Sequence, residues 1–319
     1  MKTLVFQKLK NTYPYSPLSI SPNELEILLA LKFLDFEKEL GHLPFTKRDL
    51  LRQIYLHLYR FNSQNVSMVL LNNEIQRIAE KLFQIREEVP YEFRKPANVR
   101  FNLKNTQLRL VDNATAHIIH EAHHYLGSPR NDGLHLGLYT NEVNQRNEKL
   151  LSIATLSPFD LIHISDLLPT EIHPEQVMVL SRLFAFDWCP KNTISFSLGR
   201  LFAWVREKLP NVKMLITYLN PNLGFNGTVY SSSNWTLFGL ERKERYLYLN
   251  GNYVTDRQMI NLHGTAKYEK LHTIIGDEIS KSIHPMQPLK VYSYYLDEFL
   301  KKKYSKQPVY DFTPNTKLV

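Results

Sequence analysis

The sequence predicts a mixed α/β (α+β) fold preceded by an all-α N-terminal domain. The first hundred residues repeat apolar side chains at the spacing of helices. After about residue 106, short β-type runs alternate with helical runs, which indicates a central sheet flanked by helices. Of the 319 residues, 43% are apolar, and this fraction is high enough for a sizeable core rather than a disordered chain.

Composition limits the compartment and the partners. The single cysteine, Cys189, excludes a disulfide framework and indicates a reducing compartment. No run of about 18 apolar residues occurs, so we expect no membrane span. The apolar run at the start is too short for a signal peptide, so we expect a cytoplasmic protein. The net charge of +8 is compatible with a nucleic-acid partner and equally with an ordinary basic enzyme.

Three helices are expected in the N-terminal domain, residues 1–105. The first begins with Ser21 and Pro22, which suit the cap and the first turn, and continues to Gly41. Thr46 is the expected N-cap of the second helix. The third helix is the periodic run that begins at Asn65.

The middle helix carries basic residues that raise the question of DNA binding. In a helix-turn-helix-like reader, such a helix lies in the major groove. We favour an accessory helical domain whose charges face water. The basic residues concerned are Lys47, Arg48, Arg52 and Arg60.

Two further boundaries divide the rest of the chain. Residues 89–101 contain two prolines and are expected to link the domains. The sheet-containing domain is then expected over residues 106–280. Residues 281–319 are expected to form a Lys-rich C-terminal extension, with three consecutive lysines at 301–303.

The elements of the second domain are expected to alternate between strands and helices. A helix over residues 115–126 begins after cap-type residues and stops before Gly127. Asn250-Gly251 is a preferred two-residue turn, so we expect a hairpin over residues 245–255. The other expected elements are strands at 134–140, 150–156, 177–186, 212–219 and from near 235, and helices at 192–209 and 227–235.

The helix over residues 115–126 contains the pattern His-Glu-x-x-His. In zinc peptidases two histidines one turn apart bind the metal, and the glutamate acts as the base. The third ligand of the long form of that motif is absent, because Arg130 occupies its position. We therefore favour histidines on a solvated helix face and assign no metal site. The residues expected on that face are His117, His120, Glu121 and His124.

A second group of polar residues lies where a strand passes into a helix. The strand ends at Phe186-Asp187 and the helix begins near Thr193. Exposed amides at a helix start, together with a lysine and hydroxyl groups, form an anion site suited to a pyrophosphate. The residues expected to bind it are Lys191, Asn192, Thr193 and Ser195.

Four segments taken together resemble a known family. They are "HHYL" (123–126), "LSRL" (180–183), "PKNTISFSLG" (190–199) and "GTVYSSSNWTLFG" (227–239). Their order resembles the acyl-CoA-dependent N-acetyltransferase superfamily and, more narrowly, the Mom family of phage DNA-modification proteins. The resemblance covers about residues 110–260 and implies an acetyltransferase-like mixed central sheet flanked by helices.

The resemblance also implies an activity. Mom proteins convert adenine in DNA to a form with a carbamoylmethyl group on N6, which blocks restriction endonucleases. By this resemblance the protein is expected to modify adenine in double-stranded DNA, with acetyl-CoA as the expected donor and with extrusion of the base. Two alternatives stay open, namely an ordinary acyl-CoA-dependent N-acyltransferase acting on a protein or small amine, and a catalytically inactive DNA-binding protein.

The resemblance assigns roles to individual residues. Of His124 and Tyr125, one would act in proton transfer and the other in positioning or stacking on the base. Arg182 would bind the donor's carbonyl, a phosphate or the DNA, and Ser195 would supply a hydroxyl. Asn220 stands where some relatives have an acid, so the general base would be His124 or a water. The remaining implied residues are Phe184, Phe186, Lys191, Asn192, Thr193 and Tyr230 for the cofactor, and Tyr218, Asn234 and Trp235 for DNA.

Four of these residues also have structural interpretations. Tyr125 fits the apolar face of its helix, and Arg182 fits a structural ion pair. Trp235 is more often a core residue than a stacking platform, and Ser195 fits a helix cap.

Overall fold

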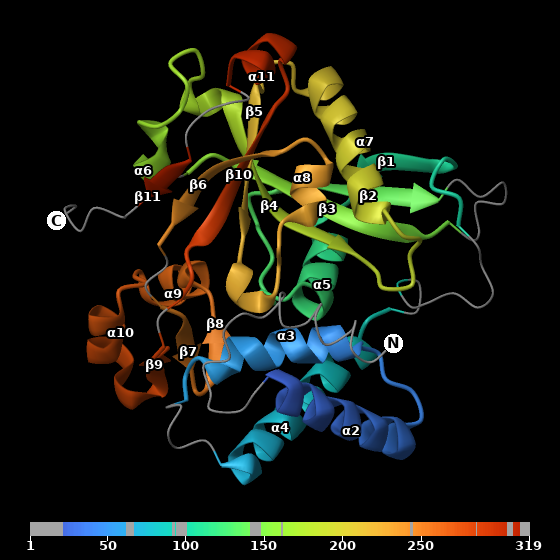
Figure 1. Cartoon of the computed structure of the whole chain (residues 1–319), viewed down its shortest axis with the longest axis vertical. Helices are drawn as coiled ribbons and strands as arrows, with labels where there is room; N and C mark the ends of the chain where they lie inside the picture. Colours follow the sequence, from blue (N-terminus) through green and yellow to red (C-terminus); the bar gives the residue numbers. More distant parts are fainter. Residues whose placement is uncertain are drawn as a thin grey trace.

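The computed structural model describes residues 22–61, 67–90, 93, 101–140, 148–160, 162–242, 245–284, 286–304 and 309–312. These residues form a large sheet, a small sheet and the helices around them (Figure 1). The helices are α2 (Pro22–Leu40), α3 (Lys47–Leu58), α4 (Met68–Glu87), α5 (Asn113–His123), α6 (Ile162–Ser165), α7 (Thr193–Lys208), α8 (Thr228–Ser232), α9 (Asp256–His263), α10 (Tyr268–Ile275) and α11 (Glu298–Tyr304). The strands are β1 (Thr106–Leu110), β2 (Leu134–Thr140), β3 (Leu150–Pro158), β4 (Val177–Ala185), β5 (Met214–Leu219), β6 (Thr236–Glu241), β7 (Leu247–Leu249), β8 (Asn252–Val254), β9 (Ile279–Lys281), β10 (Leu289–Tyr295) and β11 (Tyr310–Phe312).

The large sheet has the strand order β1-β2-β3-β4-β5-β10-β6-β11. Neighbouring strands are antiparallel, except that β4 is parallel to β5 and β6 is parallel to β11. The predicted class, a mixed central sheet flanked by helices after an all-α start, is therefore confirmed.

Helices cover the large sheet on both faces. On one face, Leu198 and Phe202 of α7 pack in one cluster with Ala154 of β3. On the other face, Ile119 of α5 packs in one cluster with Ile153 of β3. Successive strand residues point to opposite faces, so these two neighbours on β3 define an α5 face and an α7 face.

Strands β4 and β5 pair over only part of their length. Residues Val177–Leu180 pair with Met214–Thr217, whereas the later residues of β4 pair with β3 alone. A register shift opposite Thr155 leaves Ser181 as an extra residue in β4, which is a β-bulge. We call this region, residues 181–185 of β4 together with the end of β5, the strand divergence.

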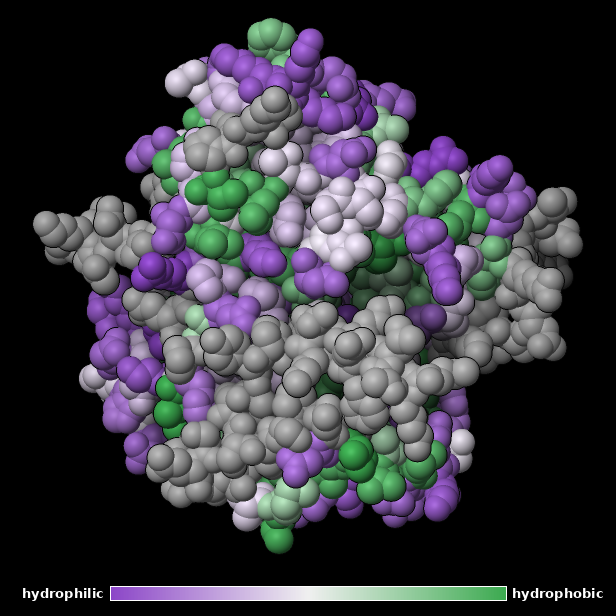
Figure 2. Space-filling model, viewed as in Figure 1, coloured by the Kyte–Doolittle hydropathy of each residue, from purple (hydrophilic) through white to green (hydrophobic). Residues whose placement is uncertain are grey.

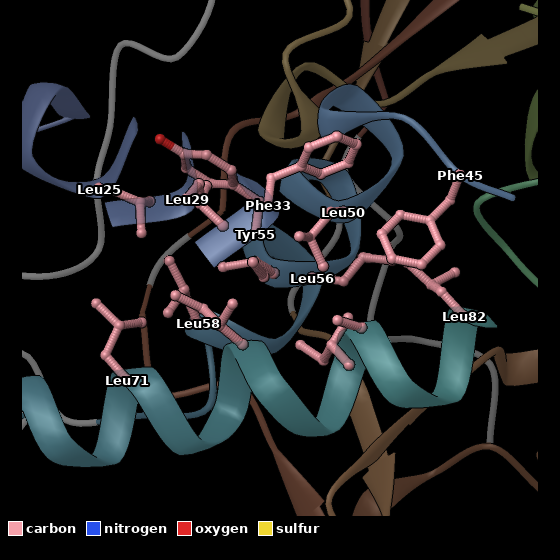
Figure 3. Close-up of a cluster of buried hydrophobic side chains, with 14 of the residues drawn as sticks. Leu25, Leu29, Phe33, Phe45, Leu50, Tyr55, Leu56, Leu58, Leu71 and Leu82 are labelled. Carbon is pink, nitrogen blue, oxygen red and sulfur yellow. The ribbon is translucent and has the colours of Figure 1, made fainter. Parts of the chain in front are cut away.

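The N-terminal helices are packed into the molecule rather than held apart by a linker. Figure 3 shows Leu25 of α2, Leu50 of α3 and Leu71 of α4 pointing into one cluster of side chains. The same cluster includes Tyr246 and Tyr248, which lie before and on β7. The helical segment and the small sheet therefore share one core. Most of the predicted linker, and Ser21, lie outside the described residues.

Helix α3 does not offer the exposed side that a DNA-reading helix needs. Its buried residues run along the second half of the helix on all sides, from Ile54 to Leu58. Arg60 forms an ion pair with Glu74 at 2.7 Å, and the Arg52 guanidinium lies 4.5 Å from the ring centroid of Phe225. A recognition helix lies exposed against the major groove, so the helix-turn-helix-like hypothesis does not fit α3. The expectation that all four basic residues face water also fails for Arg52 and Arg60.

The boundary predicted at residue 280 does not match the sheet. Strand β10 lies between β5 and β6, and it pairs with both of them. Strand β11 extends the same sheet at its edge. Residues 289–295 are therefore an integral part of the sheet rather than of an extension. The lysines at 301–303 lie on α11, which packs next to β10.

The small sheet contains the predicted hairpin. Its strand order is β8-β7-β9, and the turn between β7 and β8 is Asn250-Gly251. Both turn residues have positive φ, 49° and 74°, as a two-residue type I′ turn requires. Helices α9 and α10 next to this sheet, like strands β1 and β10, have no counterpart among the predicted elements.

The surface of the described residues combines polar areas with several apolar ones, among them a stripe on α2. Figure 2 shows hydrophobic residues both in the upper left of this view and toward the bottom, where α2 lies. The stripe consists of Ile27, Leu31 and Leu34, which are 54%, 56% and 47% exposed. Within the described part of the chain, no helix is both long enough and apolar enough to cross a bilayer.

Candidate functional site

Arg182 is a half-buried cation at the strand divergence. It follows the bulge in β4 and is opposite Thr155, so its side chain lies on the α5 face. Its Nε donates to the carbonyl oxygen of Ser128 at 2.9 Å, and its Nη1 donates to the carbonyl oxygen of Ser181 at 2.7 Å. Burial lowers the pKa of Arg182 to about 10. No carboxylate among the described residues pairs with it, although a buried charge is normally compensated.

Two neighbouring arginines differ from Arg182 in this respect. Arg130 pairs with Asp132 at 2.9 Å, and Arg257 pairs with Asp160 at 2.5 Å. Longer contacts cross-link the same four residues into a balanced network. Arg182 therefore stands out as the cation that a carboxylate, phosphate or carbonyl oxygen of a ligand would satisfy.

His124 and Tyr125 lie just beyond the end of α5. The predicted helix ran to residue 126, but α5 ends at His123 and His124 is its C-cap. The Nδ1 atom of His124 accepts the backbone N–H of Leu126 at 3.3 Å. A backbone amide can only donate, so the neutral ring carries its proton on Nε2. Burial holds the pKa of His124 well below its usual value, and the ring is therefore neutral near pH 7.

Tyr125 belongs to a row of ring side chains whose planes are tilted against one another by 32° and 48°. Its ring centroid lies 4.6 Å from that of His124 and 5.3 Å from that of Phe225. The Arg52 guanidinium lies over the next ring, that of Phe225, at 4.5 Å. Burial raises the pKa of Tyr125 to about 12, so its hydroxyl stays protonated. The row thus combines aromatic rings with one guanidinium, two kinds of group on which a nucleobase can stack.

Tyrosine hydroxyls reach the strand divergence from both faces of the sheet. Tyr253 of β8 and Tyr125 both interact electrostatically with Arg182. Tyr230 of α8 comes from the α7 face, and its hydroxyl lies 3.4 Å from Oγ1 of Thr217 on β5. Burial, and to a smaller degree the nearby Tyr125, raises the pKa of Tyr230 to about 12. The region between β4 and β5 is therefore lined by neutral donors around one cation.

Helix α3 supplies contacts to the site that the sequence did not indicate. Gln53 Nε2 donates to the carbonyl oxygen of Tyr125 at 3.1 Å, and Tyr59 donates to Oδ1 of Asn222 at 3.2 Å. These pairs are 72 and 163 residues apart in the chain, so no local pattern could indicate them. The helical start therefore holds the segments on which Tyr125 and Phe225 lie.

The turn between β4 and α7 holds the residues that were predicted to bind an anion. Asn192 is the N-cap of α7 with φ +69°, the left-handed conformation that a glycine often supplies in such turns. Its side chain caps none of the first-turn amides, while Thr193 donates its hydroxyl to the carbonyl oxygen of Pro190 at 2.7 Å. Lys191 and Asn192 are exposed, and Ser195 lies half-buried in the first turn.

Several predicted site residues lie in the core. Trp235 is 4% exposed and packs in the α7-face cluster with Phe202 and Tyr294, which leaves no ring face free for a base. Phe184 and Phe186 pack on the ring of His123 at 5.5 and 5.2 Å under α5, so they form core rather than a cofactor surface.

Three other predicted residues have different surroundings. Tyr218 lies on the α5 face, where burial and Glu241 raise the pKa of its hydroxyl. Asn234 is exposed, with φ +62°. Asn220 is 8% exposed; its amide donates to the Tyr246 hydroxyl at 2.7 Å, and its oxygen accepts the backbone N–H of Asn222 at 3.1 Å. Asn220 therefore has the contacts of a positioning residue.

The histidine-rich face of α5 is not solvated, contrary to expectation. His120 is fully buried and His124 is 8% exposed, while Glu121 is exposed. Among the described residues, no group of three or more His, Cys, Asp or Glu side chains is arranged to hold a metal ion. His120 is instead within hydrogen-bond distance of the sheet, through Thr155 of β3, and His124 accepts the backbone N–H of Leu126.

Comparison with known proteins gave one family and a set of structures. The sequence model of the family described as "Mom protein family" matches residues 105–316, which is more than half of the chain. No curated protein matches the sequence.

Three of the similar solved structures are acetyltransferases. A spermidine N-acetyltransferase from Vibrio cholerae in complex with CoA and spermine has 8% identity, covers 62% of this chain and 99% of its own, and has a TM-score of 0.36. A ribosomal-protein-S5-alanine acetyltransferase from Vibrio fischeri has 11% identity, coverages of 63% and 98%, and a TM-score of 0.36. An aminoglycoside N(6')acetyltransferase from Legionella pneumophila has 13% identity, coverages of 65% and 99%, and a TM-score of 0.33. The fold described above rests on the strand order and pairing of this chain.

Proposed function

The chain belongs to the Mom protein family, and on that premise we propose that it transfers an acyl-type group to the N6 amine of adenine in double-stranded DNA. One observation carries the proposal. The half-buried cation Arg182, which pairs with no carboxylate of the described residues, lies next to His124 and Tyr125, at the point where β4 and β5 stop pairing. A cation without a carboxylate partner in that part of the chain, beside two neutral hydrogen-bonding rings, is suited to a polar transfer reaction.

The strand divergence is the proposed place for the donor. Residues 181–185 of β4 have β3 on one side only, so their other edge is open to an extended molecule such as the arm of an acyl-CoA. Arg182 would hold the donor's carbonyl oxygen or a phosphate there. The first turn of α7 with Lys191, Asn192 and Ser195 would hold the pyrophosphate, and Asn192 has the left-handed conformation that glycine often supplies in such a turn.

The row Arg52, Phe225, Tyr125 and His124 is the proposed place for the adenine. An amine inside a duplex is out of reach, so the base has to leave the stack. The aromatic rings and the guanidinium of the row would then receive it by stacking. This assignment gives Tyr125 the stacking role, and it replaces Trp235, whose ring is buried.

His124 is proposed as a proton donor. Its Nδ1 is engaged by Leu126, and Nε2 carries the proton. In transfer from a thioester, the N6–C bond forms, the C–S bond breaks, N6 loses one proton and the thiolate gains one. The Nε2–H group of His124 would supply the proton to the leaving thiolate, so N6 needs a separate acceptor.

The chemistry of the attached group separates two versions of this proposal. Acetyl transfer from acetyl-CoA gives an amide at N6. A carbamoylmethyl group is attached through a methylene carbon and contains an amide nitrogen, which acetyl-CoA alone does not supply. Attachment of a carbamoylmethyl group, which would protect DNA from restriction, therefore needs a donor other than acetyl-CoA alone.

The direct test uses the purified full chain, a duplex oligonucleotide rich in adenine contexts, and acetyl-CoA or an extract of small molecules. The DNA is digested and its nucleosides are analysed by mass spectrometry. We expect a modified deoxyadenosine whose mass identifies the group. Deoxyadenosine that stays unmodified with both donor sources would contradict the proposal. Release of CoA in the presence of polyamines or proteins, but not in the presence of DNA, would favour an ordinary N-acyltransferase.

A further inference from the structure

Three polar side chains form a continuous hydrogen-bonded chain between α5 and the large sheet. His120 Nε2 lies 2.8 Å from Oγ1 of Thr155, and His135 Nδ1 lies 2.8 Å from the same oxygen. His120 comes from α5, Thr155 from β3 and His135 from β2. His120 is 0%, Thr155 0% and His135 1% exposed.

The chemistry of the central hydroxyl couples the two imidazoles. A threonine hydroxyl has one proton to donate and lone pairs to accept. In one arrangement that these contacts allow, one neutral ring donates to Oγ1 and the hydroxyl donates to the other neutral ring. In this arrangement the two rings have matched tautomers, and shifting both hydrogen bonds together moves one proton from one ring to the other.

The two outer nitrogens of this hydrogen-bonded series, on His120 and His135, are without hydrogen-bond partners among the described residues and lie in different places. His120 Nδ1 and His135 Nε2 are buried and have no hydrogen-bond partner among the described residues. The His120 ring centroid lies 5.9 Å from that of His124, on the side of the proposed site. The His135 ring centroid lies 6.4 Å from that of half-buried His117, near the exposed N-cap Asp112 at the start of α5. The chain thus leads from the site toward the surface.

We propose that His120, Thr155 and His135 form a relay that removes the proton lost by the acceptor amine. The inference rests on the proposed function and adds the route that this reaction lacks. As the N6–C bond forms, the N6–H bond breaks and its proton reaches His120 Nδ1, directly or through one water. His120 Nε2–H passes its proton to Oγ1, Thr155 passes its own to His135 Nδ1, and His135 Nε2–H releases one toward His117. One proton enters and one leaves.

The surroundings explain why the proton passes on rather than resting on His120. Burial, then Arg182, His135 and His117, holds the pKa of His120 to about 3. A charged His120 is therefore unstable, whereas the tautomer shift keeps every ring neutral. His124 cannot take the same role, because its Nδ1 already accepts the amide of Leu126. The charged and titratable groups facing the relay are Arg182, His117, His124 and Asp112.

The test replaces the central hydroxyl. Thr155→Val keeps the shape of the side chain but cannot relay, and Thr155→Ser keeps the hydroxyl. The matched control is Ser152→Ala, which removes another buried hydroxyl of β3, the one that donates to Ser197 at 3.0 Å on the α7 face. Thermal melting of each full-length variant establishes that it is folded. His135→Gln is the second relay variant, because glutamine accepts a hydrogen bond and cannot pass the proton on.

The readout is the single-turnover rate of adenine modification with saturating donor, in H2O and in D2O. Because general acid–base steps contribute roughly 100- to 10,000-fold to rates, we expect Thr155→Val and His135→Gln to slow transfer by at least about 30-fold. Their KM for the donor should be unchanged, while Thr155→Ser and Ser152→Ala stay within about twofold of the wild type. The rate of the wild type should fall in D2O, and the size of this isotope effect should indicate that more than one proton moves in the rate-limiting step. For Thr155→Val the isotope effect should indicate that one proton moves.

The outcomes separate this inference from the proposed function. Wild-type protein that leaves adenine unmodified overturns the proposed function, and the inference with it. Wild-type protein that modifies adenine, together with a folded Thr155→Val variant of equal rate, overturns the relay alone. As an activity-independent readout, 15N-labelled histidines in the wild type should show one protonated and one unprotonated nitrogen on His120 and on His135. An imidazolium on either ring would contradict the relay.

Discussion

Strand β3 buries hydroxyls on both of its faces, and two of them, those of Ser152 and Thr155, differ in what surrounds them. On the α7 face Ser152 donates to Ser197 among Leu, Ala and Phe side chains, so the pair is complete in itself. On the α5 face Thr155 lies between two histidines whose outer nitrogens have no partner among the described residues. Arg182, on the same face, pairs with no carboxylate in the part of the chain that the structure describes. Polar groups that the fold leaves incomplete mark the face where a ligand is expected.

Removing the guanidinium fork of Arg182, on the α5 face, should give the largest loss of activity among the variants considered. Arg182→Lys keeps the charge but loses the planar pair of donors, so we expect adenine modification to fall by about 100-fold or more, as the loss of two charge-assisted hydrogen bonds implies. The matched control is Arg257→Lys, which lies in the ion-paired network beside the site and should stay within about threefold. Single-turnover modification of duplex DNA measures both. Equal losses in the two variants would mean that Arg182 has no special role.

Asn220 differs from Arg182 because hydrogen bonds within the protein satisfy its side chain. Asn220→Ala removes the hydrogen bonds that Asn220 makes to the buried Tyr246 hydroxyl and to the backbone N–H of Asn222, so we expect the free energy of unfolding to fall by about 2–3 kcal/mol. Urea unfolding measures the change, with the exposed Ser232→Ala as control. Unchanged stability together with lost modification would instead return Asn220 to a catalytic role.

The buried histidines of α5 predict a loss of stability in acid. Burial, with Arg86 nearby, lowers the pKa of His123 from 6.5 to about 3. The unfolded chain binds this proton first as the pH falls below 6.5, so stability is full above that pH and is lost toward pH 3. The ring of His123 packs on Phe184 and Phe186, so phenylalanine is a fitting replacement. In His123→Phe the free energy of unfolding should depend less steeply on pH, by up to about 1.4 kcal/mol per pH unit. Urea unfolding from pH 7 to 4 measures the slope, and parallel curves for the two proteins would contradict this account.

Trp235 gives the smallest expected effect on the reaction. Its ring is core, and its indole N–H is buried without a partner among the described residues. Trp235→Phe should keep modification within about threefold and change the free energy of unfolding by less than about 2 kcal/mol, because a lost contact is offset by the removed N–H. A large loss of modification at unchanged stability would show that Trp235 contacts the base.

The sequence predicted local features and failed on distant ones. Asp112 as a cap, Asn250-Gly251 as a turn and the alternating strands are encoded within a few residues, and the structure has all of them. Strand β10 was obscured by the lysine-rich composition around it. Helix α5 ends before His124 although its pattern continues, because the chain has to turn there to bring Tyr125 against Phe225.

The candidate site was predictable in kind but not in arrangement. The resemblance singled out Arg182, His124 and Tyr125, and these residues do lie together. Burial of His120 under the sheet, and the contacts of Gln53 and Tyr253 from distant segments, depend on tertiary packing. A pattern of apolar and polar residues does not distinguish a solvated histidine from one hydrogen-bonded to a buried threonine.

The central claim is that the α5 face at the strand divergence modifies adenine in DNA. The most direct measurement is mass spectrometry of nucleosides from the DNA of cells that express wild-type protein, Arg182→Lys or Ser152→Ala at equal levels. We predict a modified deoxyadenosine with the wild type and with Ser152→Ala, and its loss with Arg182→Lys. Unmodified deoxyadenosine in all three, or an equal yield with Arg182→Lys, would contradict the claim.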